Sequence, residues 1–532
     1  MTSLGIVRRA RPALVAALMA AALLPTQALA QDHAHPAGEQ LGTVHFETSC
    51  DAGVAAEFDR AVALLHSFEF GAAIQGFNAV LASDSDCAMA HWGLALSRWL
   101  NPMAPGNRAA AVLEPGRQAA QSAARSAASA TPRERDYITA VGQLYEDYER
   151  RDQATRQAAY ASAMADVAAR YPTDPEARIF YAIALVAAAP PQDKTYANQL
   201  RAGAILEELL ASQPDHPGLS HYIIHAYDVP ALAAQARSAA VRYADIAPSA
   251  AHALHMPSHT FTRVGMWQES VETNLRSMES AEAASGIGEA LHAADYAMYA
   301  YLQMRNESAA RSLLARVPDL ASRFNVSAIV GAAPPSAAIF AVAAIPARYA
   351  VERKAWAEAA ALRPTTSAYA YTEAMTHFAR GLGAAHVGDY SAAAVAIDSL
   401  SALAARLRGQ NEAYWAEQVE IQGLGARAWL ALVTGDEAGA LTLMREAATR
   451  ENATEKAAVT PGPLAPAREL LGDMLMELDR PAEALTEYRG VLAREPGRYW
   501  SLDGARRAAA AVGDRAAEAQ YGAELAELTG GR

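Results

Sequence analysis

Apolar positions recur along most of this 532-residue chain with the 3.6-residue period of amphipathic helices. The period holds from about Ala55 to Leu528, with short turns between the helical stretches, whereas the alternating pattern of strands is almost absent. Several turns share one form, as in Gly388-Asp389-Tyr390 and Gly435-Asp436-Glu437, each of which precedes an alanine-rich stretch. The pattern predicts an all-α chain of short helices joined by tight turns.

Residues 465–498 form the clearest repeat unit, with a large residue and a glycine on a first helix and an alanine and an aromatic residue on a second. Its marker residues are Leu471-Gly472, Leu475, Ala484, Tyr488 and Pro496. Small residues suit the places where two helices cross closely, and large residues fill the gaps between successive pairs. These places resemble the consensus of the tetratricopeptide repeat (TPR) family. The resemblance implies an all-α, right-handed superhelical solenoid of TPR-like helix–turn–helix repeats.

Two further segments, SHYIIHAYD at 220–228 and ALHMPSHTFTR at 253–263, are similar to segments of a group of exported bacterial TPR proteins. This likeness implies a fold rather than a biochemical role.

The same two segments carry histidine pairs that repeat at a fixed distance. His221 and His225 are four residues apart, as are His255 and His259, and the second pair follows the first by 34 residues. Residues four apart share one face of a helix, and 34 residues is the length of one TPR unit. We therefore expect the four imidazoles to converge, with His252 beside them, as ligands of a transition metal such as zinc, copper or iron.

The resemblance also indicates which neighbours face the concave groove of the solenoid. Asp228, Thr262 and Arg263 occupy groove places of the repeat, and Asp228 is either a ligand or a group that orients a histidine. Three more candidates for the lining of the groove are Tyr222, His292 and His66.

Composition and charge limit the partners and the compartment. Residues 1–30 have the basic start, apolar middle and Ala28-Leu29-Ala30 end of an export signal, which predicts cleavage after Ala30 and a periplasmic or secreted protein. No later segment is apolar enough to insert into a membrane. The formal charge of −13 disfavours nucleic acid as a partner.

A proline pair and the two cysteines predict how the chain is divided and cross-linked. We expect a flexible leader at 31–45, an N-terminal TPR-like array at 46–330 with the histidine-lined groove, and a C-terminal array at 331–532, because Pro334-Pro335 marks a hinge. Cys50 and Cys87 are the two cysteines, and an even count in an exported chain predicts a disulfide between them.

Three functions fit these features. The first is a solenoid that binds a protein, peptide or small ligand in the groove, either through a bound metal or without one. The second is a metal-dependent hydrolytic or oxidative enzyme that uses the same histidines, because the sequence contains none of the common nucleophile or phosphate-binding motifs. The third is a plain scaffold for protein–protein contacts in the cell envelope.

Overall fold

A computed structural model describes residues 38–104 and 108–530 of the chain. The predicted export signal, with its cleavage point after Ala30, lies outside these residues. The described end of the predicted leader is packed rather than free: Leu41 and Val44 are buried, and the Thr43 amide donates to the Asp215 carbonyl at 2.9 Å. Contacts join residues 40–532 into one compact unit.

The prediction of an all-α fold is confirmed, since the described residues contain helices and no strand. The helices before the Pro334-Pro335 segment are α1 (Ala55–His66), α2 (Phe70–Ser83), α3 (Ala88–Trp99), α4 (Ala110–Ser126), α5 (Pro132–Gly142), α6 (Gln153–Arg170), α7 (Pro175–Ala187), α8 (Ala197–Ser212), α9 (Pro217–Ala226), α10 (Arg237–Ile246), α11 (Ala251–His255), α12 (Pro257–Arg263), α13 (Trp267–Ala283), α14 (Ile287–Gln303) and α15 (Glu307–Arg323), with short 3-10 turns at Ala52–Val54 and Ala233–Ala236.

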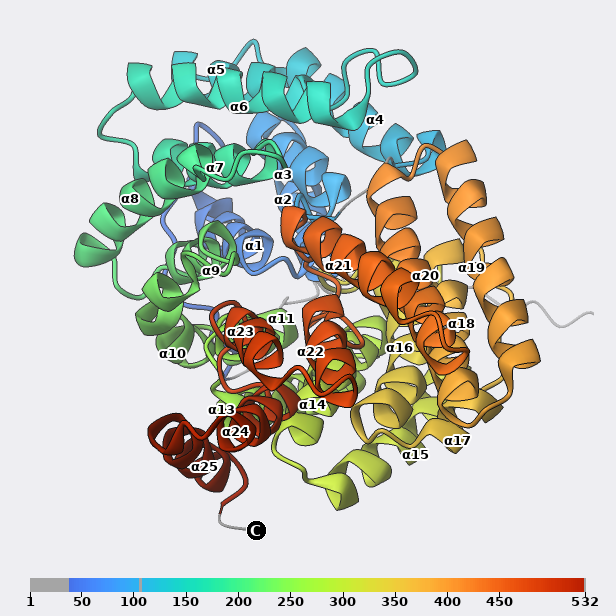
Figure 1. The fold of residues 1–532 in the computed structure, drawn as a ribbon. Helices are drawn as coiled ribbons and strands as arrows, with labels where there is room; N and C mark the ends of the chain where they lie inside the picture. The colour runs from blue at the N-terminus through green and yellow to red at the C-terminus, as the bar shows by residue number, and fades with distance from the viewer. Residues whose placement is uncertain (1–37, 105–107, 531–532) are drawn as a thin grey trace, which may run out of the picture. The chain divides into compact units, whose positions relative to one another are not determined.

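The later helices are α16 (Pro335–Glu352), α17 (Trp356–Ala361), α18 (Ala370–His386), α19 (Tyr390–Gly409), α20 (Ala413–Val433), α21 (Glu437–Ala453), α22 (Ala467–Glu477), α23 (Pro481–Leu492), α24 (Tyr499–Val512) and α25 (Arg515–Leu528). Consecutive helices pack against each other along the chain, as in the runs α18–α21 and α22–α25 (Figure 1). The protein is thus a TPR-like helical solenoid.

The recurring turn has a simple physical basis. Gly388 and Gly435 have φ angles of 82° and 93°, a left-handed conformation that glycine adopts without strain and that ends the preceding helix. The aspartate that follows each glycine then accepts a hydrogen bond from an amide in the first turn of the next helix. One dipeptide therefore ends one helix and begins the next.

Close helix crossings explain the small residues of the repeat at 465–498. A Cβ atom on Gly472 would lie 2.7 Å from the ring of Tyr488, and one on Gly504 would lie 2.3 Å from it. Tyr488 is fully buried between the helices that carry these glycines. The glycines therefore allow the aromatic ring to fill the space between helices α22 and α24.

Helices also pack across the predicted boundary at residue 331. Helix α14 contacts α16, and one apolar cluster contains residues from both, including Leu291, Ala338 and Ile345. The division into two arrays stays a prediction. Within residues 38–104 and 108–530, no helix combines the length and the apolar character needed to cross a bilayer.

The predicted disulfide is present, with an S–S distance of 2.09 Å between Cys50 and Cys87. It joins the segment before α1 to the residue that precedes α3. Replacement of both cysteines by serine should lower the free energy of unfolding of these helices by about 3–4 kcal/mol, because the unfolded chain loses a closed loop. Urea unfolding measures this difference. A reducing agent should destabilise the wild type and leave the double variant unchanged; equal sensitivity of the two would contradict the prediction.

Candidate metal centre

The structure brings the five predicted histidine ligands together, His252 included, and adds His292, which was predicted only for the lining of the groove. His221 and His225 lie on α9, His252 and His255 on α11, His259 on α12 and His292 on α14. All are buried, with exposures between 0% and 7%. They form two triads in which the three ligand atoms lie within 4.8 Å of one another: a first triad of His221, His225 and His252, and a second triad of His255, His259 and His292.

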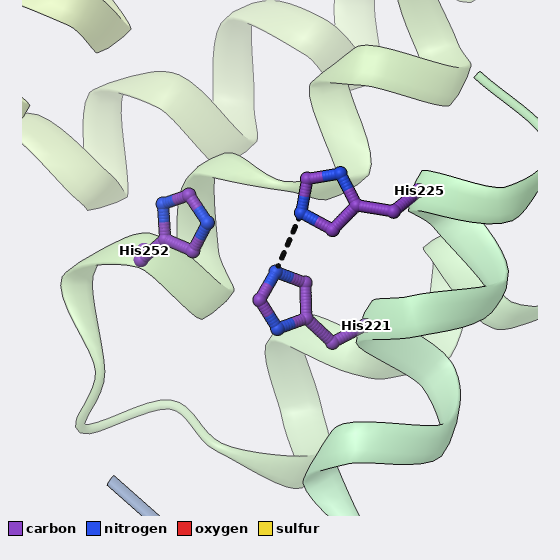
Figure 2. A group of neighbouring side chains, drawn as sticks. All are labelled: His221, His225 and His252. Atoms are coloured by element: carbon purple, nitrogen blue, oxygen red, sulfur yellow. Dashed lines mark hydrogen bonds between the residues drawn. The ribbon is translucent and has the colours of Figure 1, made fainter. Parts of the chain in front are cut away.

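The first triad has one ring whose protonation state is set by its partner. His221 Nδ1 lies 2.6 Å from the carbonyl oxygen of His66, which only accepts, so this nitrogen carries the proton and Nε2 presents a lone pair. His221 Nε2 lies 3.1 Å from His225 Nε2 (Figure 2). Figure 2 also shows the His252 ring directed toward the other two. Neither ring nitrogen of His252 has a hydrogen-bond partner among the described residues.

Two rings of the second triad are held in the same way. His255 Nδ1 donates to Asn274 Oδ1 at 2.7 Å. The side-chain amide nitrogen of Asn274 donates to the Ser270 carbonyl at 2.6 Å, which fixes the orientation of the amide. His259 Nδ1 donates to Asp228 Oδ2 at 3.0 Å. The two Nε2 atoms then face each other at 3.1 Å. Among the described residues, Nδ1 of His292 has no hydrogen-bond partner.

The backbone between the two rings differs from the continuous helix that the spacing suggests. Pro257 lacks an amide hydrogen, so the chain breaks after His255 into the short helices α11 and α12. His255 and His259 still lie side by side, with ring centroids 5.0 Å apart. The prediction of a shared face holds although the helix is interrupted.

The two triads are in direct contact. The ring centroids of His225 and His259 are 6.3 Å apart, and those of His252 and His255 are 6.0 Å apart. Within the second triad, His259 and His292 are also separated by 6.3 Å. The six imidazoles therefore form one continuous cluster.

Burial favours the neutral form of His221, His225, His255, His259 and His292. Together with the neighbouring rings, it lowers the pKa of His225 to about 3, and it lowers the pKa of His259 to about 4 although Asp228 opposes the shift. The pKa values of His221, His255 and His292 are lowered well below their usual value for the same reason. A neutral imidazole has the lone pair that a metal ion requires.

Asp228 stands outside the triads and orients one of their rings. Burial alone would raise its pKa, but Lys456 and Arg263 hold the pKa of this carboxyl well below its usual value. Arg263 Nε donates to Asp228 Oδ1 at 2.9 Å, and Lys456 Nζ lies 3.4 Å from Oδ2. The ionised carboxylate accepts the Nδ1 proton of His259, an arrangement common behind metal-bound histidines.

Two carboxyl groups, the half-buried Glu69 and the buried Glu289, border the first triad. Glu69 Oε1 accepts from the His252 amide at 3.0 Å, and burial and the nearby Glu289 raise the pKa of Glu69 to about 8. Glu289 Oε2 lies 3.7 Å from His252 Nδ1. These groups come from α14 and from the turn before α2, and no spacing in the sequence links them to the histidine pairs.

His66 and Tyr222 lie inside the helix stack instead of lining a groove. The Tyr222 hydroxyl is 3.0 Å from His66 Nδ1, and His66 Nε2 is 2.9 Å from Glu176. His216 Nε2 binds the other oxygen of Glu176 at 3.0 Å. This network holds the end of α1, where the His66 carbonyl meets His221, so its contribution to the centre is to fix a ring.

The centre is also more enclosed than an open concave groove. The segment 457–466 crosses it: the Tyr296 hydroxyl oxygen lies 3.0 and 3.1 Å from the Ala458 and Thr460 carbonyl oxygens, either of which can accept its proton. Arg348 donates to the Gly462 and Pro463 carbonyls at 3.2 and 3.1 Å. This covering explains why histidines predicted to line a groove are buried.

Two cavities adjoin the cluster. The histidine cavity is bounded by two imidazoles of each triad, by small or apolar side chains and by the polar side chains of Asn101 and Ser336. Its lining includes His225, His252, His259, His292, Met256, Ala333, Pro334, Tyr371, Trp415 and Val459. The larger aromatic cavity contains Thr262 and Arg263 from the predicted set, and its lining also includes Tyr371, Trp415, Phe378, Tyr414, Lys456 and Arg494. Tyr371 and Trp415 belong to both cavities.

Comparisons with known proteins are distant. No protein family and no curated protein matches the chain. Similar solved structures include a human IFIT1 dimer with PPP-AAAA, at 11% identity and a TM-score of 0.39 over 83% of this chain and 90% of that one. The APC/C hetero-tetramer Cut9-Hcn1 has 11% identity and a TM-score of 0.34 over 86% of this chain and 76% of that one. These similarities say nothing of what the histidines bind.

The lowered pKa values predict how stability depends on pH when metal is removed with a chelator. The unfolded histidines take up protons near pH 6.5, whereas His225 and His259 in the folded chain do so only near pH 3 and 4. Below pH 6.5 the unfolded state therefore binds more protons, and stability should fall by about 1.4 kcal/mol per pH unit for each such histidine. Urea unfolding from pH 7 to 5 measures the slope. His225→Gln with His259→Gln should make it shallower; an unchanged slope would refute this account.

Proposed function

We propose that this protein binds transition-metal ions through its buried histidine triads. One observation carries the proposal: the Nε2 atoms of His255 and His259 face each other at 3.1 Å while both Nδ1 protons are donated to oxygen acceptors. Two neutral rings in this state direct lone pairs at each other, which is repulsive unless a cation lies between them. Nitrogens bound to one tetrahedral ion at about 2.0–2.1 Å stand about 3.3 Å apart, close to the observed separation.

The surrounding residues fit a bound ion. Both nitrogens of the buried His252 and Nδ1 of the buried His292 have no hydrogen-bond partner among the described residues, although Glu289 lies 3.7 Å from His252 Nδ1; buried polar atoms rarely stay without a hydrogen bond. Asp228 and Asn274 fix the tautomers of their rings, as is usual behind metal ligands. A bound zinc, copper or iron ion would supply Lewis-acid or redox chemistry at the cavity beside the triads.

The histidine cavity favours one of the three functions over the others. A peptide needs an open groove, whereas a cavity bounded by His225, His252, His259 and His292 suits a small molecule. We therefore favour binding or conversion of a small ligand at the metal over a plain scaffold. The predicted export signal and the Cys50–Cys87 disulfide both support a periplasmic or secreted location.

Metal analysis of untagged protein tests the proposal directly. We expect zinc, copper or iron in stoichiometric amount, and at least a tenfold lower content in the variant His225→Gln with His259→Gln, because each change removes a ligand from a different triad. His45→Ala is the matched control, since the His45 side chain is 76% exposed and remote from the triads in the chain. Wild-type protein that takes up none of the three metals, from the cell or in dialysis, would contradict the proposal.

A second candidate function is the binding of an organic anion in the aromatic cavity. Tyr371 and Trp415 stack there with ring centroids 3.9 Å apart, which provides a flat apolar wall. Arg494 and Lys456 supply positive charge, and burial raises the pKa of Glu451 to about 8, so this carboxyl is mostly neutral at pH 7. An aromatic carboxylate would match the wall and the charge.

Calorimetric titration with phenylacetate tests this candidate. The wild type should bind it, and Arg494→Ala should bind it about tenfold more weakly because a cation of the cavity is lost. Lys194→Ala is the matched control. Arg494 and Lys194 both pair with Glu455, but Lys194 does not line the cavity. Equal affinity for phenylacetate and for its neutral analogue 2-phenylethanol would contradict an anion site.

A further inference from the structure

We infer that the two histidine triads form one dinuclear copper centre, which binds dioxygen between its two ions. This inference rests on the proposed metal binding and adds the number of ions, their identity and their ligand.

The number of ions follows from how the triads are built. Each triad has three imidazole nitrogens within 4.8 Å of one another, which is the donor set of one ion with an open coordination position. Rings of different triads approach to 6.0 and 6.3 Å between centroids, no farther than His259 and His292 within the second triad. Two ions held in adjoining triads are therefore close enough for one small ligand to bridge them, as in other two-metal sites.

The place of the bridging ligand is the histidine cavity. Its wall contains His225 and His252 from the first triad and His259 and His292 from the second, so an occupant meets both ions. The remaining wall is made of small, apolar or aromatic residues such as Met256, together with two uncharged polar side chains. Among the residues that the structure describes there, none is acidic and none is lysine or arginine. The cavity thus suits a small uncharged molecule.

Charge favours copper over the divalent alternatives. All six ligands are imidazoles in a buried site, with no thiolate or carboxylate among them. Asp228, the carboxylate nearest to His259, is already balanced by Arg263 and Lys456. Two buried divalent ions would bring four positive charges, against the single carboxylate of Glu289 beside His252, whereas two copper(I) ions bring two. Imidazole also binds copper well, and copper(II) stands highest in the order of divalent affinities.

The reaction balances without another reagent. Each copper(I) gives one electron to dioxygen, which takes up two electrons and becomes a bridging peroxide between two copper(II) ions. No proton is transferred and no group leaves. The electrons return to the metal when dioxygen dissociates, so the step is reversible binding.

The test uses the full chain without a tag. Metal-free protein is loaded anaerobically with copper(I) and then exposed to dioxygen. We expect two copper ions per chain, uptake of one dioxygen molecule per pair, a peroxide-to-copper absorption band and almost no electron paramagnetic resonance signal, because the two copper(II) spins couple through the bridge. Removal of dioxygen should reverse the change.

Variants assign each ion to its triad. His225→Gln and His292→Gln should each retain one copper ion and lose at least nine-tenths of the dioxygen uptake, whereas His45→Ala should behave as the wild type. If either variant fails to fold, the spin state and stoichiometry of the wild type still decide the question.

The other possible outcomes refute either the dinuclear centre alone or metal binding as a whole. Binding of a single ion, zinc uptake without copper, or two copper ions with a full resonance signal or no dioxygen uptake would refute the dinuclear centre and leave metal binding intact. Failure to bind any transition metal would refute both.

Discussion

The chemistry of this protein depends on the hydrogen bonds that ring nitrogens donate away from the histidine cluster. The Nδ1 atoms of His221, His255 and His259 are each held by an oxygen at 2.6–3.0 Å. An oxygen that only accepts fixes the proton on Nδ1 and turns the lone pair of Nε2 toward the other rings. Without these acceptors the rings would form an ordinary polar core, in which one imidazole simply donates to the next.

The acceptors come from different parts of the solenoid, so the fold and the site depend on each other. The His66 carbonyl lies at the end of α1, Asn274 on α13 and Asp228 just after α9. The buried pairing of His66 and His216 with Glu176 holds the end of α1 in position. A change in the stacking of these helices would move an acceptor and thereby change which nitrogen is free. Because the repeats pack rigidly, the acceptors stay in place and the Nε2 lone pairs of these rings keep pointing toward the cluster.

The sequence predicted those parts of the structure that depend on local spacing. Helical period, the Gly-Asp turns, the Cys50–Cys87 pairing and the convergence of the two histidine pairs follow from residues near one another or one repeat apart. The acceptor Asn274, the carboxyl pair Glu69–Glu289 and the covering segment 457–466 could not be found in this way. Their positions depend on how irregular repeats stack over long stretches of chain. The sequence predicts His292 only as a candidate for the lining of the groove, and its place in the second triad depends on how α14 stacks.

The position of the third histidine in each triad explains why the site needs a solenoid. Each triad combines a pair spaced by four residues with one histidine from the next repeat: His252 joins His221 and His225, and His292 joins His255 and His259. One repeat alone supplies two ligands, which hold an ion weakly. The third ligand is placed only when the following repeat stacks, so an ion bound there would bridge two repeats and stabilise their interface. The affinity for such an ion and the stability of the repeat interface would therefore be thermodynamically linked, so the duplicated histidine pair is informative only together with the helices that follow it.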